Sequence, residues 1–289
     1  MTLTLEFAKR NLYLFFRDRA AVFFSLLALF IIIGLYALFL GKVVVEGVRD
    51  IAGEQARFLM DSWIMAGTLA VTATTTTLGT FGIMVNDKVR KIARDFQAAP
   101  VKRSQILGGY FISTWTVGML MSLVAFLLAE LYIVGYGGQW LGLTLTLKLI
   151  GVMIISVFSS TTMMLFLVSF FTSINAYAAA STVIGSLIGF LTGIYVPVGN
   201  LPKAVQTVIK VFPPSHASSL YRQLMMQRPF NLLNLPTEIS EEIKLIFGVN
   251  FLFGEKIISP GTSVLILVGS GILFFALAVY KLSRNKLNF

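Results

Sequence analysis

The sequence contains no cysteine and a single histidine, His216, among its 289 residues. The missing thiols exclude a disulfide-stabilised scaffold, thiol catalysis and cysteine-ligated zinc or iron–sulfur centres. Charged residues are also scarce, at 12% of the chain, which is about half the share found in soluble domains. Because 56% of the residues are hydrophobic, the composition indicates neither a soluble enzyme nor a disordered chain.

Long apolar runs account for most of the sequence. A helix needs roughly 20 mostly apolar residues to cross the hydrocarbon core of a bilayer. Six runs reach that length, at about 20–40, 58–84, 106–132, 143–171, 176–196 and 262–280. The segments between them are too small for an independent folded domain. We therefore expect an all-α polytopic membrane protein in which residues 1–289 form one transmembrane domain with six spans.

Lys and Arg are distributed unevenly between the loops. Most of them lie in segments that six spans would place on the same side as the two chain ends. The positive-inside rule therefore predicts that both termini are cytoplasmic in the cell membrane. We interpret the net charge of +10 as a topology signal and expect no nucleic-acid partner, because no clustered basic and aromatic surface is evident.

Residues 1–19 predict an amphipathic elbow helix on the cytoplasmic membrane surface. Its apolar residues recur at helical spacing, and basic residues occupy the other face. Such a helix binds membrane lipid through its apolar face and its positive charge. It either anchors the topology or also contacts a cytoplasmic partner.

Residues 86–104 predict a short coupling helix in the loop between spans two and three. Asn86 would cap this helix and Pro100 would end it. The apolar stripe of this helix must be buried against lipid headgroups or against a partner protein. An acidic residue beside the stripe favours a partner protein, since anionic lipid would repel the carboxylate. The candidate contact residues are Val89, Ile92, Asp95 and Phe96.

Residues 197–261 form a long segment on the outer side. Asn200 would cap a first helix that ends at Pro213 and Pro214, and Ser215 would cap a second one. The two helices are too short to cross the bilayer, so they predict a re-entrant or interfacial hairpin. Residues 231–260 add an excursion with one further short helix near 240–247.

Two spans carry small or hydroxylated residues four positions apart. The threonines of span two either bond back to carbonyls of the same helix or line a substrate path. The small residues of span five allow close helix packing, against the same chain or a second copy. The threonines are Thr68, Thr72, Thr76 and Thr80, and the small residues are Ser181, Gly185, Gly189 and Gly193.

Two acids lie at or within the spans. Asp61 stands at the outer start of span two, where we expect it to be solvated. Glu130 lies below the outer end of span three. An ionisable group at that depth is either functional or paired with a base such as Lys148.

Catalytic motifs are missing. There is no GxxxxGK[ST] phosphate loop, no GxSxG elbow and no HExxH pair. His216 has no acid near it in sequence and is interpreted as a capping or surface residue. The chain is therefore not expected to be an enzyme or to hold a cofactor.

Four stretches together resemble the permease subunit of the type-2 ABC exporter family. They are KRNLYLFFRDRAAVFFSLL, DKVRKIARDFQAAPVKRSQILGGYFIS, GIYVPVGNLPKAVQTVIKVFPPSHASSLYRQLM and the basic C-terminal tail. The resemblance covers nearly the whole chain. The coupling stretch departs from the commoner pattern, with RKIARDFQ and Asp95 in place of a Gly-Thr before a Glu, and residues 231–260 are longer than is typical.

The resemblance implies a dimer of permeases with two copies of a separate ATPase subunit, which would hold ATP and Mg²⁺. Closure of the ATPases would move the coupling helix and export an amphipathic substrate such as a drug, lipid, glycan or toxic peptide. The second permease would be an identical chain or a close paralogue, with spans one and five at the interface. The alternatives are an ion-coupled secondary transporter with Glu130 as proton carrier, and a non-transport membrane scaffold or sensor.

Overall fold

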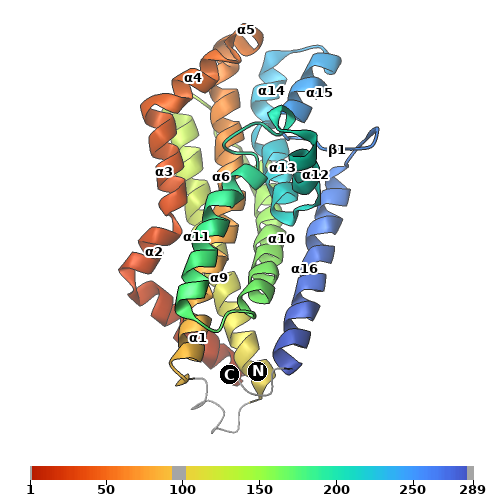
Figure 1. Ribbon diagram of the computed structural model, residues 1–289. Helices are drawn as coiled ribbons and strands as arrows, with labels where there is room; N and C mark the ends of the chain where they lie inside the picture. Colours follow the sequence, from red (N-terminus) through yellow and green to blue (C-terminus); the bar gives the residue numbers. More distant parts are fainter. Residues whose placement is uncertain (1, 93–101, 285–289) are drawn as a thin grey trace.

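The computed structural model describes residues 2–92 and 102–284, which form an elongated bundle of helices (Figure 1). Within those ranges, five helical stretches are long and apolar enough to cross a membrane, or six if one bent pair counts as a span. These lengths and compositions agree with a multi-pass all-α membrane protein. The long helices are α6 (Ala56–Thr80) with its continuation α7 (Gly82–Val89), α9 (Arg103–Gly135), α10 (Leu143–Val168), α11 (Ile174–Leu191) and α16 (Pro260–Arg284).

The first predicted span, 20–40, is not one straight helix. It consists of α2 (Arg19–Ser25), α3 (Leu27–Leu35) and a π-helical turn, η1 (Tyr36–Leu40), which leads into α4 (Gly41–Glu46). Two helical stretches, Arg19–Ser25 and Leu27–Leu38, meet at 46°. Leu26 between them has φ −100° and ψ 0°, and Thr76 of α6 donates a hydrogen bond to the Ser25 carbonyl at 3.4 Å. A side chain from another helix thus contacts the backbone at the bend, a recognised setting for a sharp kink.

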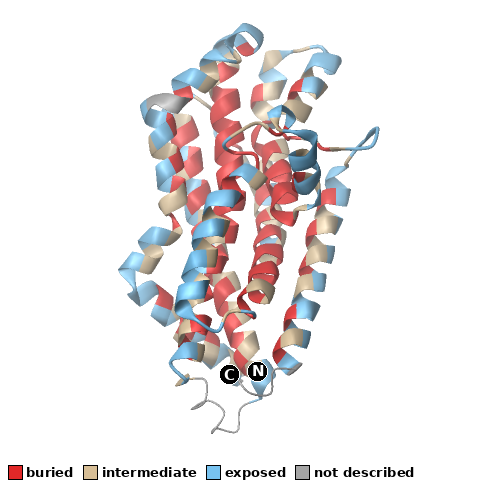
Figure 2. Ribbon diagram, viewed as in Figure 1, coloured by how far each residue is buried: buried red, intermediate tan, exposed pale blue. Residues whose placement is uncertain are grey.

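Helix α6 lies at the centre of the bundle. It packs against α9, α10 and α13 (Pro213–Met225), and Figure 2 shows it buried along almost its whole length. Helices α10 and α16 pack along each other beside it. The central position of α6 means that most of its side chains are covered by the same chain.

A helix, α1 (Thr2–Arg17), forms at the residues where the sequence predicts an elbow, at the end of the bundle where both chain ends lie (Figure 1). It packs against the beginning of α9. A Cβ added at Gly109 would come within 2.5 Å of the Phe7 Cβ, so a glycine allows this close approach. Ala8 and Phe15 are buried, whereas Leu5 is 50% exposed.

Two helices lie in the segment for which the sequence predicts an outer hairpin, but they begin at other residues than predicted. Helix α12 (Lys203–Val211) begins after Pro202, and Asn200 lies in the 3-10 turn η3 (Val198–Asn200), so the predicted Asn200 cap is wrong. Pro213 begins α13 instead of preceding it, because a proline ring fits the first helical turn. Ser215 therefore lies inside α13, where it donates to the Leu191 carbonyl at 2.6 Å.

The end of the bundle opposite the chain termini carries short elements. The predicted helix near 240–247 is confirmed as α15 (Thr237–Ile246). The other short elements are α5 (Arg49–Ala52), η2 (Gly53–Gln55), α14 (Gln227–Leu233) and the antiparallel strands β1 (Leu252–Phe253) and β2 (Lys256–Ile257).

Candidate functional site

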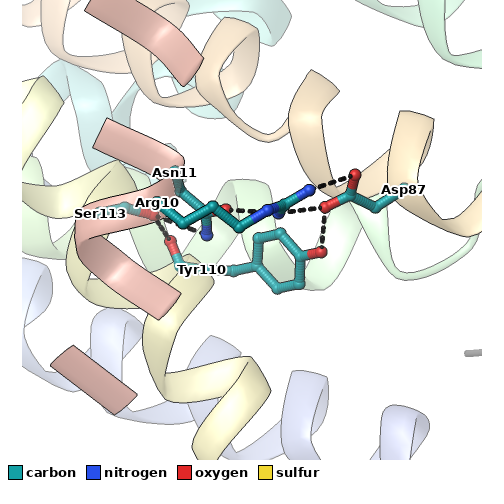
Figure 3. Close-up of polar contacts among 5 residues, drawn as sticks. All are labelled: Arg10, Asn11, Asp87, Tyr110 and Ser113. Atoms are coloured by element: carbon teal, nitrogen blue, oxygen red, sulfur yellow. Dashed lines mark hydrogen bonds and ion pairs between the residues drawn. The ribbon is translucent and has the colours of Figure 1, made fainter. Parts of the chain in front are cut away.

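A polar network joins α1, α7 and α9 (Figure 3), and α1 lies at the end of the bundle that carries both termini (Figure 1). The Arg10 guanidinium donates to both carboxylate oxygens of Asp87, at 2.7 and 3.0 Å. The Tyr110 hydroxyl donates to Asp87 Oδ2 at 2.6 Å. Asn11 continues the network by donating to Ser113 Oγ at 3.4 Å. Three segments far apart in sequence are thus connected through one carboxylate.

The geometry of the network favours its charged form. A two-point contact between a guanidinium and a carboxylate is stronger than a neutral hydrogen bond and fixes orientation. The hydrogen bond to Asp87 is the main reason why the pKa of Arg10 is raised, against an opposing effect of burial. Asp87 is 4% exposed, so loss of the Arg10 guanidinium would leave a buried carboxylate without its ion-pair partner, which is costly.

The position of Asp87 depends on a break between α6 and α7. Phe81 interrupts the helix there, and the Tyr177 hydroxyl of α11 donates to the Leu78 carbonyl just before it. Helix α7 then continues to Val89. The prediction that Asn86 starts a separate coupling helix is therefore wrong, because residues 86–89 continue the preceding helical stretch.

The predicted coupling residues are only partly within the described chain. Val89 is the last residue of α7 and is 39% exposed. Lys91 follows with φ +61°, so Val89 and half-buried Ile92 do not lie on one uninterrupted helix as their spacing predicted. Asp95 and Phe96 lie outside the described residues. Lys88 connects this region to the next loop by donating to the Phe171 carbonyl at 3.2 Å.

A groove of about 720 Å³ runs between the bent first span, α6 and α11. Its walls are mostly apolar, with Ile31 and Leu35 on one side, and Thr75 and Tyr177 add hydroxyl groups. The site therefore combines a large apolar surface with a few polar atoms, which is typical of small-molecule pockets.

The threonine stripe does not face this groove. Thr68, Thr72, Thr76 and Thr80 are at most 2% exposed, and they are covered within the chain. Thr68 donates to the Met65 carbonyl at 2.7 Å and Thr80 to the Thr76 carbonyl at 2.8 Å. In this chain the predicted path-lining face is an internal packing face, and the neighbouring Thr75 reaches the groove instead.

The small residues of α11 do not form one continuous packing stripe. Ser181 and Gly185 line the groove, and a Cβ at Gly185 would meet nothing within 4 Å. Gly189 is covered by the Tyr195 ring of the same chain. Gly193 has φ +68° and ends the helix, a conformation that favours glycine. Residues at the same four-residue spacing thus have three different roles: they line the groove, lie under the Tyr195 ring, or end the helix.

The two acids in the spans have partners within the chain. Glu130 is 3% exposed, and its Oε2 accepts a hydrogen bond from the Leu141 N–H at 2.9 Å. It holds the turn between α9 and α10. Asp61 is not solvated as predicted, because Arg57 one helical turn earlier pairs with it at 2.7 Å and the residue is 1% exposed.

Two further buried residues of α13 were not predicted. His216 is fully buried, so the surface alternative of its interpretation is wrong. Its Nε2 lies 2.9 Å from the carbonyl of Lys210 in the last turn of α12, which is a capping contact, and its Nδ1 lies 3.2 Å from Ser263 Oγ. Arg222 is also fully buried, donates to the Gly193 carbonyl at 2.9 Å and lies 5.1 Å from the Trp63 ring centroid. The sequence carried no signal for either, because their partners come from distant segments.

Comparison with known proteins identifies the family. The model of the ABC-2 family transporter proteins matches residues 50–280. The chain belongs to this family. A search of the curated proteins gave no match. As an ABC-2 family protein, the chain is a membrane transport component, and its multi-pass helices are those of a permease. The resemblance noted in the sequence is thereby confirmed at the level of the family.

Proposed function

We propose that this chain is the permease subunit of an ATP-driven exporter that moves an amphipathic substrate out of the cell. The groove of about 720 Å³ between the first span, α6 and α11 carries this proposal. Apolar walls beside the hydroxyls of Thr75 and Tyr177 suit a molecule that has both an apolar body and a polar group. A groove open on one side forms half of an enclosed path when a second copy faces it.

The working assembly in this proposal contains two permeases and two ATPase subunits, and the ATPases hold ATP and Mg²⁺. The second permease is an identical chain or a close paralogue, which packs beside the groove through α11 and the first span. The complex resides in the cell membrane with both termini in the cytoplasm, in line with the distribution of Lys and Arg. The ATPase docks on residues 86–104, as the family resemblance implies.

The network around Asp87 gives this docking region a route to the rest of the chain. Asp87 lies within 86–104 and is bound by Arg10 of α1 and Tyr110 of α9. A displacement of the docked segment would therefore be passed to two helices at once. Glu130, the proton carrier of the alternative mechanism, is already engaged by the Leu141 N–H, so the geometry does not favour ion coupling.

Capture of the tagged chain from its native membranes tests the assembly. We expect an ATPase subunit with a phosphate loop among the proteins that co-purify, and ATP hydrolysis only when that subunit is present. Transport in sealed vesicles should require ATP and should persist when the proton gradient is collapsed. Transport that continues without ATP and stops with the gradient would contradict the proposal.

Asp87→Asn tests the role of the network. The amide keeps the size of the side chain but loses the charge that binds Arg10, so we expect transport per ATP hydrolysed to fall about tenfold while the ATPase still co-purifies. Asp50→Asn is the matched control, because Asp50 is an exposed acid at the opposite end of the bundle. Equal coupling ratios in the two variants would show that the Asp87 carboxylate does not transmit the movement.

A further inference from the structure

A second cleft lies at the end of the bundle that carries both termini, between the first turns of α9 and the last turns of α16. Its volume is about 200 Å³. The polar residues that line it come from the ends of the two helices and are Arg103, Ser104 and Ser283. The apolar ones lie further along the same helices and are Ile106, Leu107, Val279 and Leu282. The cleft is therefore polar at its mouth and apolar below it.

The face of α9 that lines the cleft continues beyond it. Residues four apart share one face of a helix, so Phe111 lies on the same face of α9 as the lining residues Arg103 and Leu107. Phe111 approaches Phe275 of α16, with ring centroids 5.4 Å apart. Eight residues at ~1.5 Å each place the rings ~12 Å from Arg103 along the axis. That distance is close to the ~15 Å of hydrocarbon in one bilayer leaflet.

The charge at the mouth of the cleft is positive. Its lining side chains include one guanidinium and two hydroxyls but no carboxylate. Lys102 precedes Arg103 at the beginning of α9, where the helix dipole also favours an anion. Val279 is 41% exposed, so the apolar part of the cleft is open along the outside of the bundle.

We propose that this cleft binds one anionic phospholipid from the leaflet on the side of the chain ends. The phosphate group contacts the Arg103 guanidinium and the Ser104 hydroxyl, and one acyl chain lies along Leu107 and Val279 as far as the Phe111–Phe275 pair. The bound lipid fills the gap between α9 and α16 at that end. This assignment depends on the chain lying in a membrane and is independent of the transported substrate and of any ATPase.

Native mass spectrometry of the full-length chain tests the proposal. The protein is purified in detergent with equal amounts of phosphatidylglycerol and phosphatidylcholine that carry identical acyl chains. We expect one phosphatidylglycerol to be retained in preference to phosphatidylcholine. Arg103→Gln should lower its retention about tenfold, because a charge-assisted contact to phosphate is lost. Lys9→Gln is the control, since Lys9 is an exposed base on α1 at the same end of the bundle.

Two further measurements separate this site from general attraction to a basic surface. Leu107→Trp keeps Arg103 but fills the apolar part of the cleft, so retention should fall for both lipids. Inorganic phosphate should not displace the bound lipid, because it lacks the acyl chain. Equal retention of the two lipids, equal effects of Arg103→Gln and Lys9→Gln, or displacement by inorganic phosphate would overturn the proposal.

Discussion

Helices α6 and α11 are both apolar spans, but the rest of the chain buries α6 and leaves α11 largely exposed. In the most apolar window of the stretch Arg49–Val89, which contains α6, 78% of the residues are buried, whereas the corresponding share in α11 is 11% (Figure 2). The chain supplies the neighbours of α6 itself. It leaves nearly all of α11 for lipid or for another protein. The contrast separates the part of the fold that one copy completes from the part that an assembly would complete.

Polarity differs between the two helices in a way that reverses the rule for soluble proteins. The buried helix α6 carries a run of threonines, and Thr68, Thr76 and Thr80 donate to carbonyls of the same helix or of the first span. The exposed helix α11 presents Val183, Leu187 and Phe190, which are 55%, 50% and 47% exposed. Lipid is as apolar as these side chains, so nothing drives them inside, and small or hydroxylated residues mediate close packing instead.

Trp63→Ala in α6 should produce the largest effect on stability. Trp63 is 2% exposed, its indole N–H donates to the Phe247 carbonyl at 2.8 Å, and its ring packs edge-on against Phe247. Truncation of a buried aromatic residue typically costs about 3–5 kcal/mol. We expect a loss of that size in the free energy of unfolding, measured by SDS titration in mixed micelles.

Leu187→Ala in α11 is the matched comparison for Trp63→Ala. Leu187 is half exposed, so its loss from the isolated chain should change the unfolding free energy by less than about 1 kcal/mol. A large loss for Leu187→Ala in dilute, monomeric protein would mean that α11 is held by the chain as firmly as α6 is.

Gly67→Val should have an intermediate effect on stability, and comparison with Gly185→Val separates folding from assembly. A Cβ at Gly67 of α6 would come within 2.4 Å of Ile194, whereas one at Gly185 of α11 would meet nothing within 4 Å. Gly67→Val should therefore cost about 1–3 kcal/mol through overpacking. Gly185→Val should leave the unfolding of the single chain unchanged.

The effect of Gly185→Val is measured on the oligomeric state. If α11 packs against a second copy beside the groove, the added side chain should weaken the dimer, measured by light scattering in detergent across a range of protein concentrations. A dimer as stable as that of the unchanged chain would place the interface elsewhere.

Local and long-range features of the fold were not equally predictable. The bounds of the spans follow from hydropathy within a few residues, because length and composition are local properties of the chain. The bend at Leu26 and the pair between Arg10 and Asp87 are not encoded locally. The pair joins residues 77 positions apart. The sequence next to Asp87 shows only a local pattern, in which Asn86 is typical of a helix start.

The candidate site shows the same division. Four-residue spacing correctly identified α6 and α11 as helices with distinctive faces. It could not show that Thr72 would be covered by the chain or that Gly193 would end α11, because both outcomes depend on which helices pack together. Periodicity reveals a face of a helix but not the neighbour that the face meets.

Thr75→Val and Thr76→Val should have the smallest effects and test the comparison at single-residue resolution. The two threonines are adjacent in α6, but Thr75 lines the groove and Thr76 is fully buried, with its hydroxyl 3.4 Å from the Ser25 carbonyl. Valine keeps the shape and removes the hydroxyl.

For Thr76→Val we expect a loss of about 0.6 kcal/mol in unfolding free energy, the average for hydrogen bonds between membrane helices, and unchanged transport. For Thr75→Val we expect unchanged stability and a shift of transport toward the more apolar members of a panel of amphipathic dyes, measured in vesicles that contain the chain and its ATPase. If instead Thr76→Val shifts the dye preference and Thr75→Val does not, the substrate meets the buried face of α6, and the groove beside α11 is not the path.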